Sequence, residues 1–166
     1  MSEVNVEEVD WERSERGETL IKRKNLAAPA GGELIGTSLY ELPAGRRSYP
    51  YHYHTANEEA LFVLAGTGAI RLEDGILTLE SGDYVALPPG EGSAHRVVND
   101  GDGTLRYLMI STMRDPDVIV YPDSEKVGVY TGGAPGRDGA QDRQQYFREG
   151  TAVDYWHGEE EDAAGE

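Results

Sequence analysis

Short apolar runs separated by turn residues dominate the middle of the chain. From residue 33 onward, runs rich in Val, Leu, Ile and Tyr recur at short intervals, with Gly, Pro, Asp and Asn clusters between them. Strands of this length and spacing are typical of sandwiches, jelly rolls and closed barrels. The predicted strands cover residues 34–42, 59–65, 69–72, 76–79, 84–87, 95–99 and 105–112. We therefore expect an all-β fold.

The two ends of the chain lack this pattern. Residues 1–18 and 159–166 are dominated by Glu and Asp, which favours loosely ordered tails. The basic stretch 20–25 is interpreted as a solvated edge strand protected by its lysines rather than as a binding patch. The segment after residue 112 is rich in Pro and Gly and too poor in apolar residues for a core of its own. We expect an irregular N-terminal extension over 1–30, a barrel over 31–121, and an irregular C-terminal extension with an acidic tail over 122–166.

Composition narrows the possible partners. The 166 residues carry 31 acids against 15 bases, a formal net charge of −16, which opposes binding to nucleic acid or anionic lipid. Lys occurs only at Lys22, Lys24 and Lys126, a balance that favours a protein of a salt-loving organism over an ordinary acidic surface. No run is long and apolar enough to span a bilayer, and the N-terminus lacks the features of a signal peptide. We expect a soluble, cytoplasmic protein.

The chain has no cysteine, so any metal site must use nitrogen and oxygen ligands. His52 and His54 are two residues apart, and on a strand they point to the same face. Glu59 opens the apolar run 59–65, and His95 opens another predicted strand after a Pro- and Gly-rich loop. Imidazoles and a carboxylate suit iron, manganese, nickel, zinc or copper, whereas calcium and magnesium prefer all-oxygen shells.

The spacing of these residues resembles the two motifs of the cupin superfamily. Gly45, His52, His54, Glu59 and Gly66 follow the first motif, with one extra residue after the first glycine. The second motif is matched by a further set, with two extra residues before its histidine: Gly82, Pro88, Gly90, His95 and Asn99. The resemblance implies a double-stranded β-helix, or jelly-roll barrel. It also implies one divalent transition metal per chain, held by His52, His54, Glu59 and His95.

Several residues near the motifs admit more than one interpretation. Glu58 competes with Glu59 for the carboxylate role, but only Glu59 keeps the motif spacing, so Glu58 should face solvent. Arg46 and Arg47 are candidate anion contacts at the barrel mouth. The aromatic group 155–157 either caps the barrel, docks on a partner or belongs to a loose tail. Some cupins keep the barrel and lose the metal, and this alternative stays open.

The resemblance leaves the activity open, because cupins include enzymes and binding proteins. An enzyme would use the metal as a dioxygenase, isomerase or decarboxylase acting on a small polar metabolite. The alternative is a non-catalytic module that binds a sugar-like or anionic molecule beside a structural metal. No second acid or base can be assigned to the site from the sequence. We also expect a homodimer, because small cupins are commonly dimers and the strand 34–42 offers an apolar edge.

Overall fold

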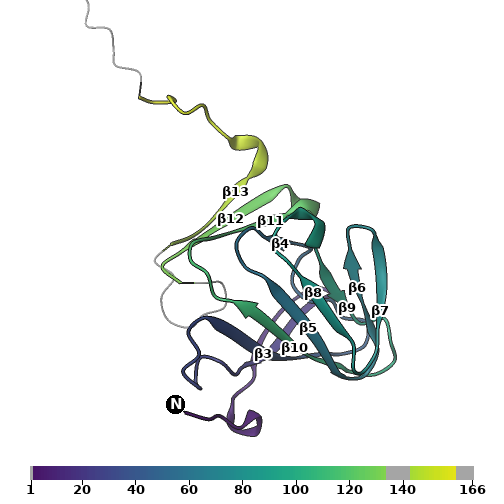
Figure 1. The fold of residues 1–166 in the computed structure, drawn as a ribbon. Helices are drawn as coiled ribbons and strands as arrows, with labels where there is room; N and C mark the ends of the chain where they lie inside the picture. The colour runs from purple at the N-terminus through teal and green to yellow at the C-terminus, as the bar shows by residue number, and fades with distance from the viewer. Residues whose placement is uncertain (1, 134–142, 160–166) are drawn as a thin grey trace, which may run out of the picture.

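The computed structural model describes residues 2–133 and 143–159, and the described chain is all-β, as predicted (Figure 1). Four short 3-10 turns accompany the strands, and no helix of this part is long and apolar enough to cross a membrane. The strands are β1 (Glu12–Arg16), β2 (Thr19–Asn25), β3 (Ile35–Leu42), β4 (Tyr53–His54), β5 (Glu59–Ala65), β6 (Gly68–Leu72), β7 (Gly75–Leu79), β8 (Tyr84–Leu87), β9 (Arg96–Val98), β10 (Leu105–Thr112), β11 (Asp117–Tyr121), β12 (Lys126–Thr131) and β13 (Arg143–Arg148). The seven predicted strands all occur, with small shifts at their ends.

The strands form three antiparallel groups. The largest sheet has the order β1-β2-β3-β10-β5-β8, the second β13-β12-β11-β4, and the third β7-β6-β9. Figure 1 shows the second group at the top of the barrel and the third group at its right-hand side. Neighbours that are far apart in sequence, such as β3 beside β10, close the barrel.

The hydrophobic core lies between the largest sheet and the three-stranded group. Strand alternation sets its composition: in β5, Leu61 and Val63 are almost fully buried, whereas Leu64 is 38% exposed. The core residues come from both groups: Tyr40, Leu42, Leu61, Val63, Ile70, Leu79, Leu87, Val97, Leu105 and Tyr107. A second, smaller cluster of buried hydrophobic residues lies on the second sheet and consists of Ile119, Tyr121 and Tyr130.

Gly66 directly follows β5, where the chain passes close to the start of β10. Its φ of +84° lies in the left-handed region, and an added Cβ would lie 2.4 Å from the carbonyl oxygen of Thr104. This backbone contact cannot move aside as a flexible side chain could. The last glycine of the first motif is therefore a structural requirement of the turn.

The N-terminal region is more regular than the sequence indicated. Residues 12–16 form β1 rather than a loosely ordered tail, and β2 lies between β1 and β3 rather than at an edge. The basic side chains of β2 are accommodated by ion pairs and by Trp11, whose ring lies 4.3 Å below the Lys22 Nζ atom. Strand β3 is also interior, so it offers no edge for dimerisation. The homodimer therefore stays a prediction, and an exposed edge of β3 no longer supports it.

The segment after residue 112 contributes three of the four strands of the second sheet. Strands β11, β12 and β13 pair in sequence order, and β11 also pairs with β4, which carries His54. Local composition did not reveal them because their apolar residues complete the barrel instead of forming a separate core. The acidic tail from residue 160 and the segment 134–142 lie outside the described residues.

Candidate metal centre

His52 and His95 are placed opposite each other by their backbones. The amide of His52 donates to the carbonyl of His95 at 3.1 Å, and the reverse hydrogen bond is 2.8 Å. Directly paired residues of an antiparallel bridge point to the same face. The two imidazole centroids are accordingly 4.8 Å apart. Residues 43 positions apart in the sequence thus meet at one point of the barrel wall.

His54 and Glu59 reach the same point from other strands. His54 ends the short strand β4 and pairs with Ile119 of β11, while Glu59 begins β5 between Leu87 and Ser111. The Nε2 atoms of His54 and His95 both lie 3.4 Å from Oε2 of Glu59. One candidate ligand atom from each of His52, His54 and Glu59 lies within 4.8 Å of the others. His95 adjoins this group through Glu59.

Each imidazole is oriented by a hydrogen bond at its Nδ1 atom. Nδ1 of His54 contacts Oδ2 of Asp117 at 2.5 Å, and the partners of the other two are the carbonyl oxygens of Pro50, at 2.8 Å, and Ser93, at 3.0 Å. Because these partners are acceptors, Nδ1 of each neutral ring carries the hydrogen, and Nε2 then keeps its lone pair for the interior. Metal-binding histidines are oriented in this way.

Glu59 provides the test of whether a cation suits the site. Its side chain is only 12% exposed, and Oε2 is buried without a hydrogen-bond partner among the described residues. An unpaired buried carboxylate oxygen is costly. A divalent cation between this oxygen and the imidazole nitrogens would remove the deficit, so the residues present fit a transition metal.

The three imidazoles differ in their protonation. Burial lowers the pKa of His52 well below its usual range, and neighbouring His95 and His54 lower it further. Burial also lowers the pKa of His95, although the charge of Glu59 opposes this. For His54, burial is outweighed by the hydrogen bond to Asp117 and the charge of Glu59, so its pKa is raised. His52 and His95 are therefore neutral at pH 7, whereas a metal would compete with a proton at His54.

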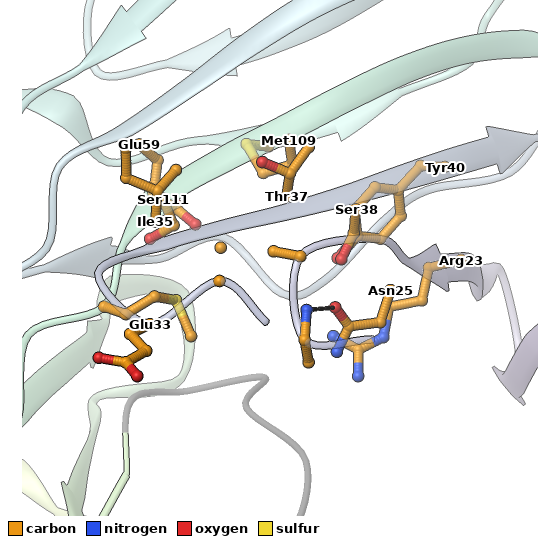
Figure 2. A pocket seen from close by; sticks show the side chains of 15 residues that line it. Arg23, Asn25, Glu33, Ile35, Thr37, Ser38, Tyr40, Glu59, Met109 and Ser111 are labelled. Atoms are coloured by element: carbon orange, nitrogen blue, oxygen red, sulfur yellow. Dashed lines mark hydrogen bonds between the residues drawn. The ribbon is translucent and has the colours of Figure 1, made fainter. Parts of the chain in front are cut away.

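The four side chains line one wall of a cavity of about 450 Å³. Much of the remaining lining is aromatic, with Tyr121 stacked on His52 at a centroid distance of 5.9 Å and Tyr49 edge-on to it at 6.5 Å. A smaller hollow of about 70 Å³ adjoins the cavity and shares Arg23, Tyr40 and Glu59 with it. Figure 2 shows Glu59 and Ser111 at one end of this hollow and Arg23 with Asn25 at the other. The cavity volume lies in the range of small-molecule sites.

The other predicted site residues lie outside the cavity. Glu58 is exposed, as expected. Arg46 and Arg47 instead pair with Glu15 at 2.7 Å and Glu18 at 3.3 Å, so their expected role as anion contacts has no support here. The aromatic group 155–157 is exposed, and Tyr155 contacts Trp156 rather than the barrel.

Three residues that the sequence did not single out belong to the site. Asp117 is 1% exposed and orients His54, from 63 residues further along the chain. Arg23 and Lys126 line the cavity and supply its positive charge outside the imidazoles. Alternation along residues 20–25 would have placed Arg23 on the same face as Ile21, but nothing in the sequence indicated that this face is internal.

The fold and the site together define a β-barrel protein with a buried His and Glu cluster in a small-molecule cavity. Residues 38–111 match the model of the Cupin domain family, so the chain contains a cupin domain. The resemblance that the two motifs indicated is therefore confirmed. None of the curated proteins compared with the chain matches it.

Solved structures with the same fold support this assignment. A candidate sugar phosphate isomerase from Acidithiobacillus ferrooxidans is 26% identical, with a TM-score of 0.77 over 89% of this chain and 90% of that one. A sugar phosphate isomerase of the cupin superfamily, from Silicibacter pomeroyi, is 18% identical, with a TM-score of 0.77 over 90% of this chain and 94% of that one. A predicted oxalate decarboxylase from Thermotoga maritima is 21% identical, with a TM-score of 0.56 over 66% and 96%. At these identities, the latter two establish the fold alone.

Proposed function

We propose that the chain is a metal-dependent isomerase of a small polar metabolite, with one divalent transition metal on His52, His54, Glu59 and His95. The observation that carries the proposal is the unpaired Oε2 of Glu59 beside imidazoles whose Nδ1 atoms are already engaged. The metal would be iron, manganese, nickel or zinc. The cavity in front of the cluster gives a ligand room to approach it.

The chain supplies further groups for chemistry on oxygen-rich molecules. A bound cation would act as a Lewis acid toward a carbonyl or hydroxyl oxygen. Burial raises the pKa of Tyr121, and its contacts with Tyr130 raise it further, so its hydroxyl stays protonated and can donate to a substrate oxygen. Lys126 adds a positive charge 4.3 Å from the centre of the Tyr121 ring.

Isomerisation is favoured over the other cupin reactions by the similarity to the Acidithiobacillus ferrooxidans protein, which extends over most of both chains. An aldose and its ketose differ only in the positions of hydrogen atoms on adjacent carbon and oxygen atoms. Their interconversion needs neither an oxidant nor a second substrate. The proposed reaction therefore requires no redox partner and no co-substrate.

A second function is a non-catalytic module that binds a small molecule beside a structural metal. The observation that favours it concerns the described residues lining the cavity: they include no carboxylate or imidazole outside the candidate ligands. An isomerase needs a base to remove a proton from carbon. In the binding module this requirement does not arise.

The test combines metal analysis with a turnover assay. Protein reconstituted separately with iron, manganese, nickel and zinc should retain about one ion per chain by elemental analysis, and Glu59→Gln should retain less. Glu58→Gln is the matched control, since it changes the neighbouring, exposed carboxylate. Proton NMR would then follow interconversion of aldose and ketose phosphates. Metal retention without conversion supports the binding module, and failure to retain any of the four ions contradicts both functions.

A further inference from the structure

The positively charged guanidinium of Arg23 lines the cavity, and most of its N–H groups donate no hydrogen bond to the described residues. Its side chain is 15% exposed, and its Nε atom donates to Oε2 of Glu12 at 2.8 Å. Glu12 and Arg23 are direct cross-strand partners, so this bond fixes the guanidinium from the side of β1. Neither Nη atom of Arg23 is hydrogen-bonded to another residue of the described chain. Four of the five guanidinium N–H groups are therefore available.

The register of the sheet separates Arg23 from the candidate metal cluster. Arg23 pairs with Tyr40, which pairs with Tyr107 of β10, whereas Glu59 pairs with Ser111 of the same strand. Four residues along a strand correspond to about 13 Å, and both Arg23 and Glu59 line the cavity. Tyr49 also lines the cavity, with its ring centroid 6.5 Å from that of His52 and 6.3 Å from that of Tyr40. The gap suits a small molecule with a recognisable group at each end.

The charge around the cavity points to an anionic group on that molecule. The described lining holds one carboxylate, Glu59, which belongs to the candidate metal cluster, and two cations outside that cluster, Arg23 and Lys126. The rest of the protein is strongly acidic, with a formal net charge of −16, and repels anions at long range. An anion would be held only by a local fork of donors. Arg suits this task because its planar guanidinium binds carboxylate or phosphate through two parallel hydrogen bonds.

We propose that Arg23 is a specificity-determining residue that binds an oxyanion group at the end of the cavity opposite the candidate metal cluster. This inference rests on the proposed function and narrows its substrate to small polyhydroxy compounds with a terminal phosphate or carboxylate. The oxyanion accepts from the Nη atoms while Glu12 retains Nε. Oxygen atoms at the other end of the ligand face His52, His54 and Glu59.

Isothermal titration calorimetry on manganese-loaded protein tests the inference with three probes: ribose 5-phosphate, ribonate and ribose. At least one of the two anions should bind about tenfold or more tightly than ribose, since hydrogen bonds to charged groups are the stronger ones. The comparison of ribose 5-phosphate with ribonate identifies the oxyanion. Arg23→Gln should weaken that anion's binding by about tenfold or more and leave ribose unchanged. Arg23→Lys should give an intermediate loss, because it keeps the charge without the fork.

Lys22→Gln is the matched control. It removes one positive charge from the adjacent position of β2, where Lys22 pairs with Glu41 and does not line the cavity. We expect less than about a twofold change in anion affinity, because this charge is outside the cavity and screened by solvent. Thermal unfolding of each variant checks that the fold is retained, and if Arg23→Gln unfolds, Arg23→Lys alone must show the selective loss.

The inference would be overturned by equal affinity for ribose and both anions, by no binding of either anion, or by equal effects of the substitutions at Arg23 and Lys22. A loss seen only in Lys126→Gln would also overturn it. The same titration after removal of the metal with a chelator distinguishes failure of this inference from failure of the proposed function. Anion binding that depends on Arg23 but not on metal supports this inference even where metal retention fails. Retained metal without dependence on Arg23 contradicts this inference alone.

Discussion

Asn in place of Asp117 should weaken metal binding although the side chain lies outside the candidate ligand set. Both carboxylate oxygens of Asp117 act as acceptors: Oδ2 from His54 Nδ1 at 2.5 Å, and Oδ1 from the amide of Ala56 at 3.1 Å. An amide has one acceptor oxygen and one NH₂ group. In Asp117→Asn, either the Nδ1–H group of His54 or the amide of Ala56 must therefore face the new NH₂ group, which is itself a donor.

The magnitude follows from which donor loses its partner. If the NH₂ group faces His54, Nδ1 becomes the acceptor and the hydrogen moves to Nε2, which removes the lone pair facing Glu59. Loss of such an orienting partner costs about 10- to 100-fold in metal affinity, or about 1.4–2.8 kcal/mol. If it faces Ala56 instead, an unpaired buried amide costs about 1–3 kcal/mol of stability. Because Asp117 is 1% exposed, water cannot compensate.

Competition with a fluorescent chelator would measure metal affinity, and urea unfolding of the metal-free protein would measure stability. Asp123→Asn is the control, since Asp123 is 46% exposed and pairs with Arg71 at 2.6 Å. It should leave metal affinity unchanged and alter stability by less than about 1 kcal/mol. A folded Asp117→Asn protein that binds metal within about threefold of the unmodified chain would refute the reasoning.

Three further predictions concern stability. Leu61→Ala removes a fully buried core side chain and should cost about 2–5 kcal/mol in urea unfolding, whereas Leu77→Ala, at a 48% exposed position, should cost far less. Asn99→Asp should lower the thermal unfolding midpoint, because the buried Nδ2 of Asn99 donates to the carbonyls of Leu42 at 2.6 Å and Gly103 at 2.7 Å. A carboxylate oxygen in its place would face both carbonyl oxygens. An unchanged midpoint would contradict the stabilising role of these two hydrogen bonds. Molar potassium chloride should raise the thermal midpoint more than sucrose does, because salt shortens the Debye length from about 10 Å at 0.1 M to about 3 Å at 1 M and screens the net charge of −16. Equal midpoints in low and molar salt would remove the basis for the salt-loving interpretation.

The sequence determined the barrel and the position of the candidate cluster within it. Seven strands were predictable because each buried strand shows its alternation and its turn residues locally, as β5 does between Glu59 and Gly66. The four candidate ligands were predictable because His52 and His54 share one face of an extended segment, and Glu59 and His95 stand at the starts of apolar runs. In the structure these starts meet at one point. Local pattern and spacing carry this information without any knowledge of distant contacts.

Only the tertiary structure decided what surrounds the cluster. Asp117 reaches His54 because β11 pairs with the distant strand β4. Arg23 and Lys126 line the cavity because their strands join the barrel, and on an exposed strand the same side chains would be ordinary surface charges. Strands β1 and β13 could not be predicted from local pattern, because their sequences, ERSER and RQQYFR, show no alternation of apolar and polar residues. Arg46 and Arg47 show the converse, since they lie next to the first motif in sequence but bind Glu15 and Glu18 outside the cavity. Side-chain direction at a site depends on which strands become neighbours, and that is a property of the closed barrel as a whole.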